Sequence, residues 1–61
     1  MSFTDFLNLY RIETALRLLD ETDKKITDIA LESGFQSVRN FNEAFRKKIG
    51  ISPSEYKLRK A

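Results

Sequence analysis

The sequence has 61 residues, a formal net charge of +2, and no cysteine, histidine or tryptophan. A chain of this length forms one small domain that buries only about 60% of its unfolded surface. The missing cysteine and histidine remove disulfides, thiol nucleophiles and the usual ligands of zinc and haem, so we expect no metal, no cofactor and no enzyme. No apolar run approaches the ~18 residues of a membrane span, and a chain without disulfides fits a reducing, cytoplasmic setting.

The charge is distributed unevenly along the chain. Residues 1–35 hold four basic and seven acidic side chains, whereas residues 36–61 hold seven basic and two acidic ones. A basic segment on a small domain is typical of a surface that binds polyanions. Lysine and arginine also solvate helix faces without any ligand, and the charge alone leaves both interpretations open.

The first predicted element is a helix over residues 3–20, with Ser2 or Thr4 as its N-cap. Its apolar residues occupy more than one face. One face holds Leu7, Tyr10 or Arg11, Ile12, Ala15, Leu18 and Leu19. A second set points elsewhere and consists of Phe6, Leu9 and Leu16. Because the remaining residues can cover only one side of this helix, we expect protein outside this sequence to cover the other.

A polar connection leads to a short helix predicted over residues 26–33. Gly34 follows it, in the left-handed position that closes a helix. The next helix is predicted over residues 38–49, with Ser37 as its N-cap and apolar residues at spacings of three and four that mark one buried face.

Gly50 ends this third helix, and a last one is predicted over residues 53–59. Ser52 and Glu55 form a capping-box pattern around Pro53, which stands at the first helical position. The elements together predict an all-α fold, a small bundle of about four helices.

The segment 26–49 has the pattern of a helix-turn-helix, in which a short helix and a sharp turn precede a longer helix with one polar face. Ala30 supplies the small side chain that two steeply crossing helices need at their closest approach, and Phe35 fills the junction after Gly34. In such motifs the second helix enters the major groove of DNA. An ordinary helical hairpin in a bundle has the same local pattern, and these residues alone do not exclude it.

Residues along nearly the whole chain point to a family. They are Arg11, Ile12, Ala15, Leu18, Leu19, Ile26, Ile29, Ala30, Gly34, Phe35, Ser37, Phe41, Phe45, Arg46, Lys47, Gly50, Ser52, Pro53 and Tyr56. In this register the chain resembles the DNA-binding domain of AraC/XylS-type bacterial transcriptional regulators. Glu43 departs from the pattern, since a basic residue is frequent at its position.

The resemblance implies a homeodomain-like helix-turn-helix domain, in which residues 3–20 are a linker helix and residues 26–49 the second of two helix-turn-helix units. The chain is then expected to be a fragment of a larger regulator, and Phe6, Leu9 and Leu16 the surface that the first unit buries. The expected partners are double-stranded DNA, that first unit, and a ligand-binding or oligomerisation domain. The alternative is a small protein-interaction module that self-associates through its apolar first helix.

Recognition helices read bases mainly from their N-terminal part. We therefore expect base contacts from Val38, Arg39, Asn42 and Glu43. Arg39 can fork onto guanine O6 and N7, Asn42 can pair with adenine N6 and N7, and Glu43 can accept from cytosine N4. Val38 can meet a thymine methyl or pack in the core, and Glu43 can instead repel phosphates.

Phosphate contacts need donors at the groove edges and carry no sequence information. The candidates are Lys25, Thr27, Ser37, Asn40, Arg46 and Lys47. Ser37 and the unpaired amides that follow it favour an anion, while a solvated surface is the alternative for Arg46 and Lys47. An ion pair with a carboxylate explains Arg11 as well as a phosphate contact does. The sequence therefore predicts sequence-specific binding of double-stranded DNA in transcription regulation.

Overall fold

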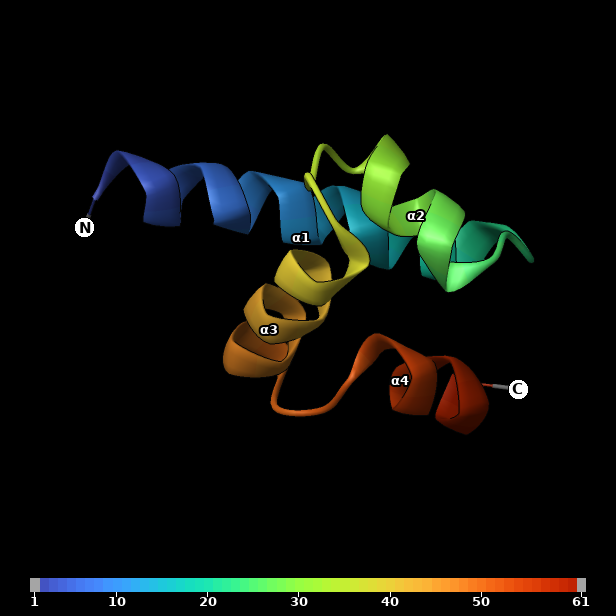
Figure 1. Cartoon of the computed structure of the whole chain (residues 1–61). Helices are drawn as coiled ribbons and strands as arrows, with labels where there is room; N and C mark the ends of the chain where they lie inside the picture. The colour runs from blue at the N-terminus through green and yellow to red at the C-terminus, as the bar shows by residue number, and fades with distance from the viewer. Residues whose placement is uncertain (1, 61) are drawn as a thin grey trace.

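The computed structural model describes residues 2–60, which form four helices (Figure 1). Their bounds are α1 Phe3–Glu21, α2 Ile26–Glu32, α3 Val38–Ile49 and α4 Pro53–Lys60. The predicted all-α fold is confirmed, and α3 has its predicted bounds. Helices α1 and α4 each run one residue further than predicted, and α2 ends one residue earlier because Ser33 is its C-cap. None of the four helices is both long and apolar enough to cross a membrane.

The core lies where α1, α2 and α3 meet. Its buried apolar residues are Ile12, Ala15, Leu19, Ile29, Ala30, Phe35, Phe41 and Phe45. Ala15 and Ala30 are completely buried, as expected where small side chains let helices approach closely. Half-buried side chains from all four helices pack against this cluster, so α4 joins the same core through Tyr56.

A row of aromatic rings runs through the core from the turn to α4. The ring centroids of Phe35 and Phe41 lie 5.3 Å apart, those of Phe41 and Phe45 5.6 Å, and those of Phe45 and Tyr56 5.8 Å. The tilted and edge-on arrangements are those that aromatic pairs prefer. The row therefore ties the α2–α3 turn, α3 and α4 to one another.

Local caps fix where the helices begin and end. Ser2, Ser37 and Ser52 each accept a hydrogen bond at 3.1 Å from the backbone N–H three residues on, which satisfies an amide at the start of a helix. Gly34 and Gly50 both have φ of +98°, a conformation that other residues rarely adopt. The capping box at Ser52 is only half formed, because the Glu55 carboxylate accepts from Arg59 at 3.0 Å instead of turning back.

The structure decides between Tyr10 and Arg11 and corrects two residues that were predicted to point outward. Tyr10 is 68% exposed, and Arg11 is the residue that packs inward, its guanidinium carbon 5.8 Å from the centre of the Phe35 ring. Leu16 packs on the core, and Leu9 is half-buried in a groove facing α3. Phe6 remains exposed, on the N-terminal half of α1 that extends past the other helices (Figure 1).

Helix α4 is attached through polar contacts to the end of α1 and the connection after it. The Tyr56 hydroxyl donates to the Asp20 carboxylate at 3.0 Å, which, with burial and the charge of Asp20, raises the pKa of Tyr56 above its ordinary 10.0. The Lys57 ammonium donates to the Lys24 carbonyl at 3.0 Å, and that of Lys60 to the Leu19 carbonyl. The fold itself therefore uses much of the positive charge of α4.

Candidate nucleic-acid interface

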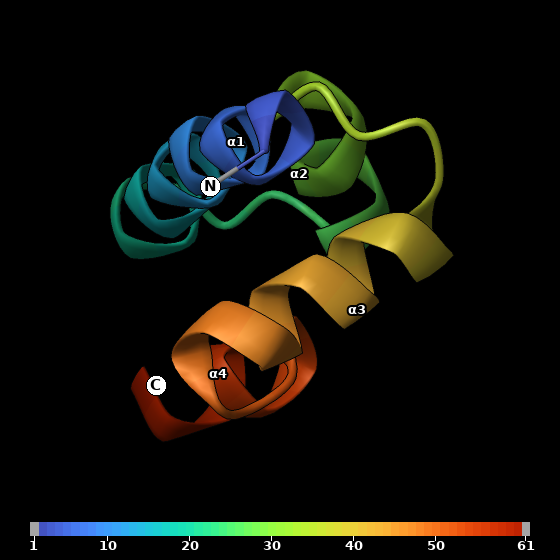
Figure 2. The same ribbon diagram turned by 90° about the vertical axis from the view of Figure 1, so that its left-hand side faces the viewer.

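Helix α3 exposes a row of polar side chains: Arg39, Asn40, Asn42, Glu43, Arg46, Lys47 and Lys48. Its N-terminal end projects away from the other helices (Figure 2). Phe41 and Phe45 on its inner face are completely buried, and this fixes which side of the helix faces outward. Four basic residues and one acidic residue give α3 a formal charge of +3. The outward face combines positive charge with uncharged amides, as a DNA-reading helix requires.

The structure brings the four predicted base-contact residues together on the first half of α3. The side chain of Arg39 is 87% exposed and that of Glu43 67%, and the Arg39 Nε lies 3.4 Å from the Glu43 Oε1. Asn42 is exposed beside them. Val38 is half-buried and packs against the core, so only part of its side chain is open to a ligand.

The predicted phosphate-contact residues divide between two elements. Arg46, Lys47 and Asn40 are exposed on α3, and Ser37 caps that helix by accepting from the Asn40 N–H. The Ser37 hydroxyl keeps its own proton for a further acceptor. Lys25 and Thr27 are exposed at the start of α2, with Lys25 at its N-cap position, so they belong to a separate element from the other four.

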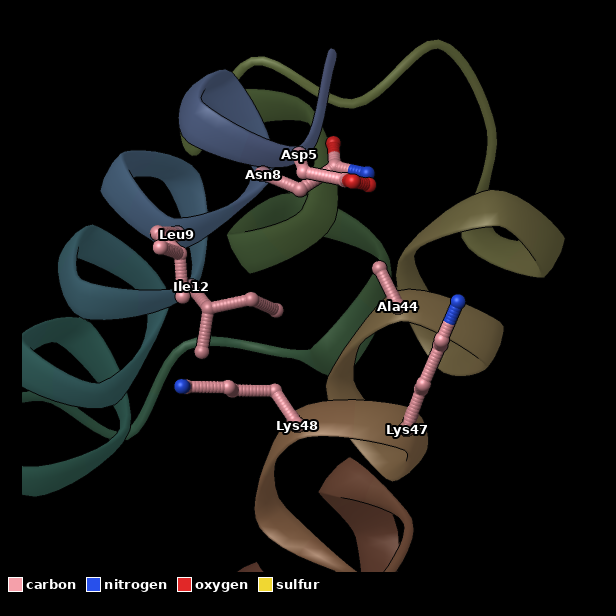
Figure 3. A pocket seen from close by; sticks show the side chains of 7 residues that line it. All are labelled: Asp5, Asn8, Leu9, Ile12, Ala44, Lys47 and Lys48. Carbon is pink, nitrogen blue, oxygen red and sulfur yellow. The ribbon is translucent and has the colours of Figure 1, made fainter. Parts of the chain in front are cut away.

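An open groove of about 460 Å³ separates the N-terminal part of α1 from the C-terminal half of α3. Figure 3 shows its lining: Asp5, Asn8, Leu9, Ile12, Ala44, Lys47 and Lys48. The Lys48 side chain extends beneath α1 toward Ile12, away from the outer face of α3. Arg46 does not line this groove, and the Lys47 side chain points away from α1 (Figure 3), so these two cations remain on the outer face of α3.

A second hollow lies between α1 and the outer face of α3. Thr4, Asn8 and Arg11 line it from α1. Opposite them stand Phe35 and Gln36 of the turn and four residues of α3: Asn40, Glu43, Ala44 and Lys47. Thr4 and Asn8 were not predicted from the sequence as side chains near the candidate interface. Their spacing of four, with Arg11 three further on, marks a polar stripe of α1 and was the available signal.

Arg11 has a structural position in this arrangement. Its guanidinium stacks over Phe35, and its Cγ would lie 3.6 Å from a Cβ placed on Gly34. Among residues 2–60 no ion pair involves Arg11. The contact holds the turn that precedes α3.

Comparisons with known proteins point to one family. A family model described as a helix-turn-helix domain matches residues 1–59. The melibiose operon regulatory protein of Escherichia coli is 39% identical over 57 residues, which are 93% of this chain and 19% of that protein. An uncharacterized HTH-type transcriptional regulator of Staphylococcus aureus is 42% identical over 57 residues, 93% of this chain and 8% of that protein. The chain thus spans less than a fifth of these relatives, and no solved structure gives a significant match.

Proposed function

Because this chain belongs to the AraC-type helix-turn-helix family of transcriptional regulators, we propose that it binds double-stranded DNA sequence-specifically in transcription regulation. The binding mode is insertion of α3 into the major groove. The observation that supports it most is the outward face of α3, where Arg39, Asn42 and Arg46 are exposed and α3 carries a formal charge of +3. Among residues 2–60, none of these three side chains belongs to the core cluster or packs against it.

The roles follow from position along α3. Arg39, Asn42 and Glu43 lie on its first half and reach base edges, with Val38 adding apolar contact to a thymine methyl. Further along the helix, Arg46 and Lys47 reach the phosphates at the groove edge.

The remaining phosphate contacts come from the helix starts. Ser37 and Asn40 contact a phosphate at the N-terminus of α3, where unpaired amides and the helix dipole favour an anion. Lys25 and Thr27 contact a phosphate from α2. A single helix-turn-helix unit of this size binds weakly, with a Kd nearer to the ~10⁻⁴–10⁻⁶ M of non-specific binding than to that of a full regulator.

The test is fluorescence anisotropy of a labelled duplex titrated with the chain at several salt concentrations. Each phosphate contact adds about 0.9 to the slope of log K against log salt. We expect Arg46→Ala to lower that slope by about one contact without changing the melting temperature, since its side chain is exposed.

Arg59→Ala is the matched control. It removes the same charge from an exposed arginine, but this one lies on α4 and pairs with Glu55 at 3.0 Å. Equal losses of slope in the two variants would mean that the chain responds to DNA only through its net charge. That result would contradict groove insertion by α3.

A second candidate function is protein docking through α1. Phe3, Phe6 and Tyr10 are 76%, 63% and 68% exposed and share one stripe of the helix, at spacings of three and four. We propose that within a larger regulator this stripe packs against a preceding helix-turn-helix unit, and that in this chain alone it favours self-association. Sedimentation equilibrium tests the latter: concentration-dependent mass that Phe6→Ser abolishes supports it, and a monomer at all concentrations contradicts it.

A further inference from the structure

One side chain on the outward face of α3 has the wrong charge for a DNA-binding surface. Glu43 is the sole acidic residue of α3, with Arg39 one turn before it and Arg46 and Lys47 one turn after it. Its carboxylate lies 3.4 Å from the Arg39 Nε, and both side chains are mostly exposed. Exposed pairs of this kind contribute little to stability, so the fold does not require the pair.

A carboxylate on such a surface weakens binding to every DNA sequence, because it faces the phosphates with the same charge. It is favourable only where it meets a hydrogen-bond donor. In the major groove the base edges offer two donors, the N4 amino group of cytosine and the N6 amino group of adenine. The effect of Glu43 on DNA affinity therefore depends on the base that it meets: it is unfavourable at an acceptor and favourable at a donor.

The position of Arg39 determines which of these two donors the carboxylate can meet. With its Nε directed at Glu43, its terminal nitrogens remain free to donate as a fork, with the carboxylate beside them. The pair thus presents two donors followed by an acceptor. A G·C pair presents the complement across its major-groove edge: the guanine N7 and O6 acceptors, then the cytosine N4 donor.

Every other base pair opposes this arrangement at two of its three positions. An A·T pair sets the adenine N6 donor against the guanidinium and the thymine O4 against the carboxylate. In T·A the second position is again the adenine donor, and the third is the adenine N7 acceptor. A C·G pair sets a donor against the first guanidinium nitrogen and an acceptor against the carboxylate.

We propose that Arg39 and Glu43 act as one unit that reads a single G·C base pair in one orientation. This rests on the proposed insertion of α3 into the major groove. Glu43 is in this unit a specificity residue: it lowers the affinity for DNA in general and restores it at the matching base pair. Arg39 supplies the direct contact to guanine.

The test is selection of bound duplexes from a synthetic pool with randomised central base pairs, at low salt, followed by sequencing. Glu43→Gln keeps the shape and one acceptor but removes the charge and adds a donor. We expect it to reduce the preference for G·C at one position at least about fivefold, the lower end for loss of a base-edge contact. We expect its affinity for the unselected pool to rise, and Arg39→Ala to lose the preference at the same position.

Glu55→Gln is the matched control, since Glu55 forms an exposed ion pair of the same spacing with Arg59 on α4. It should leave every base preference unchanged. The unit is overturned, with the proposed function intact, if the wild-type chain selects a sequence but Glu43→Gln preserves each preference, or if the two α3 variants alter different positions. A wild-type chain that shows no salt-dependent binding to the pool overturns both proposals.

Discussion

Replacing Gly34 by alanine, beside the same replacement at Gly50, measures how the turn before α3 is held. Both glycines have φ of +98°, so each new side chain adopts a left-handed conformation that costs about 1–2 kcal/mol. Only at Gly34 does the added Cβ meet a neighbour, 3.4 Å from the Arg11 Nε, whereas at Gly50 nothing lies within 4 Å. A separation of 3.4 Å is at the tight limit of ordinary van der Waals contact, so Arg11 needs to shift only slightly. The shift can cost at most its stacking on Phe35, which at exposed sites is worth about 0.5–1 kcal/mol.

We therefore expect Gly50→Ala to lower the free energy of unfolding by about 1–2 kcal/mol, and Gly34→Ala to lower it by up to about 1 kcal/mol more. Urea unfolding followed by circular dichroism measures both values. In an Arg11→Ala background the two glycine substitutions should cost the same. A Gly34→Ala chain that is more stable than Gly50→Ala, or a difference that persists without Arg11, would refute this account of the turn.

Three further predictions concern the core and α4. Phe41→Ala should unfold the domain, because a cavity costing about 3–5 kcal/mol matches the whole stability of a core this small, while Phe6→Ala leaves the melting temperature unchanged. The raised pKa of Tyr56 means that the folded state favours the neutral hydroxyl. The contribution of this hydroxyl to the free energy of unfolding is therefore constant below pH ~10 and is lost as the pH rises above that value. Tyr56→Phe should make the fall in stability above pH 10 shallower. Lys57→Met removes the hydrogen bond to the Lys24 carbonyl, so it should speed amide exchange in α4. It should leave the affinity for DNA unchanged, and a loss of affinity would contradict this prediction.

The parts of the fold that the sequence predicted well depend on local chemistry. Ser37 and Gly50 bound α3 as expected, because a cap and a left-handed glycine act within one turn of the helix. The buried face of α3 followed from spacing alone, since residues three and four apart share one side of a helix. The candidate DNA-reading face, opposite it, was predictable for the same reason.

The parts that the sequence did not predict depend on contacts between distant segments. Choosing Arg11 over Tyr10 as the inward residue requires the position of Phe35, which lies 24 residues further on. Lys57 and Lys60 count in the basic segment 36–61, but in the structure both ammonium groups donate to backbone carbonyls at or just after the end of α1. Lys48 differs from its neighbours because it follows Ala44 by four residues and Phe45 by three, which places it on the side of α3 that faces α1 (Figure 3). The spacing therefore carried this signal, which the sequence-based prediction did not use.

The most direct test of α3 as the DNA-reading helix is an NMR amide titration of the labelled chain with duplex DNA at two salt concentrations. We expect shifts clustered at residues 37–47 and at the start of α2, and we expect them to be weaker at the higher salt concentration. Shifts confined to Phe6 and Leu9 as protein concentration rises, with no response to DNA, would contradict this expectation. They would assign the chain to protein docking through α1.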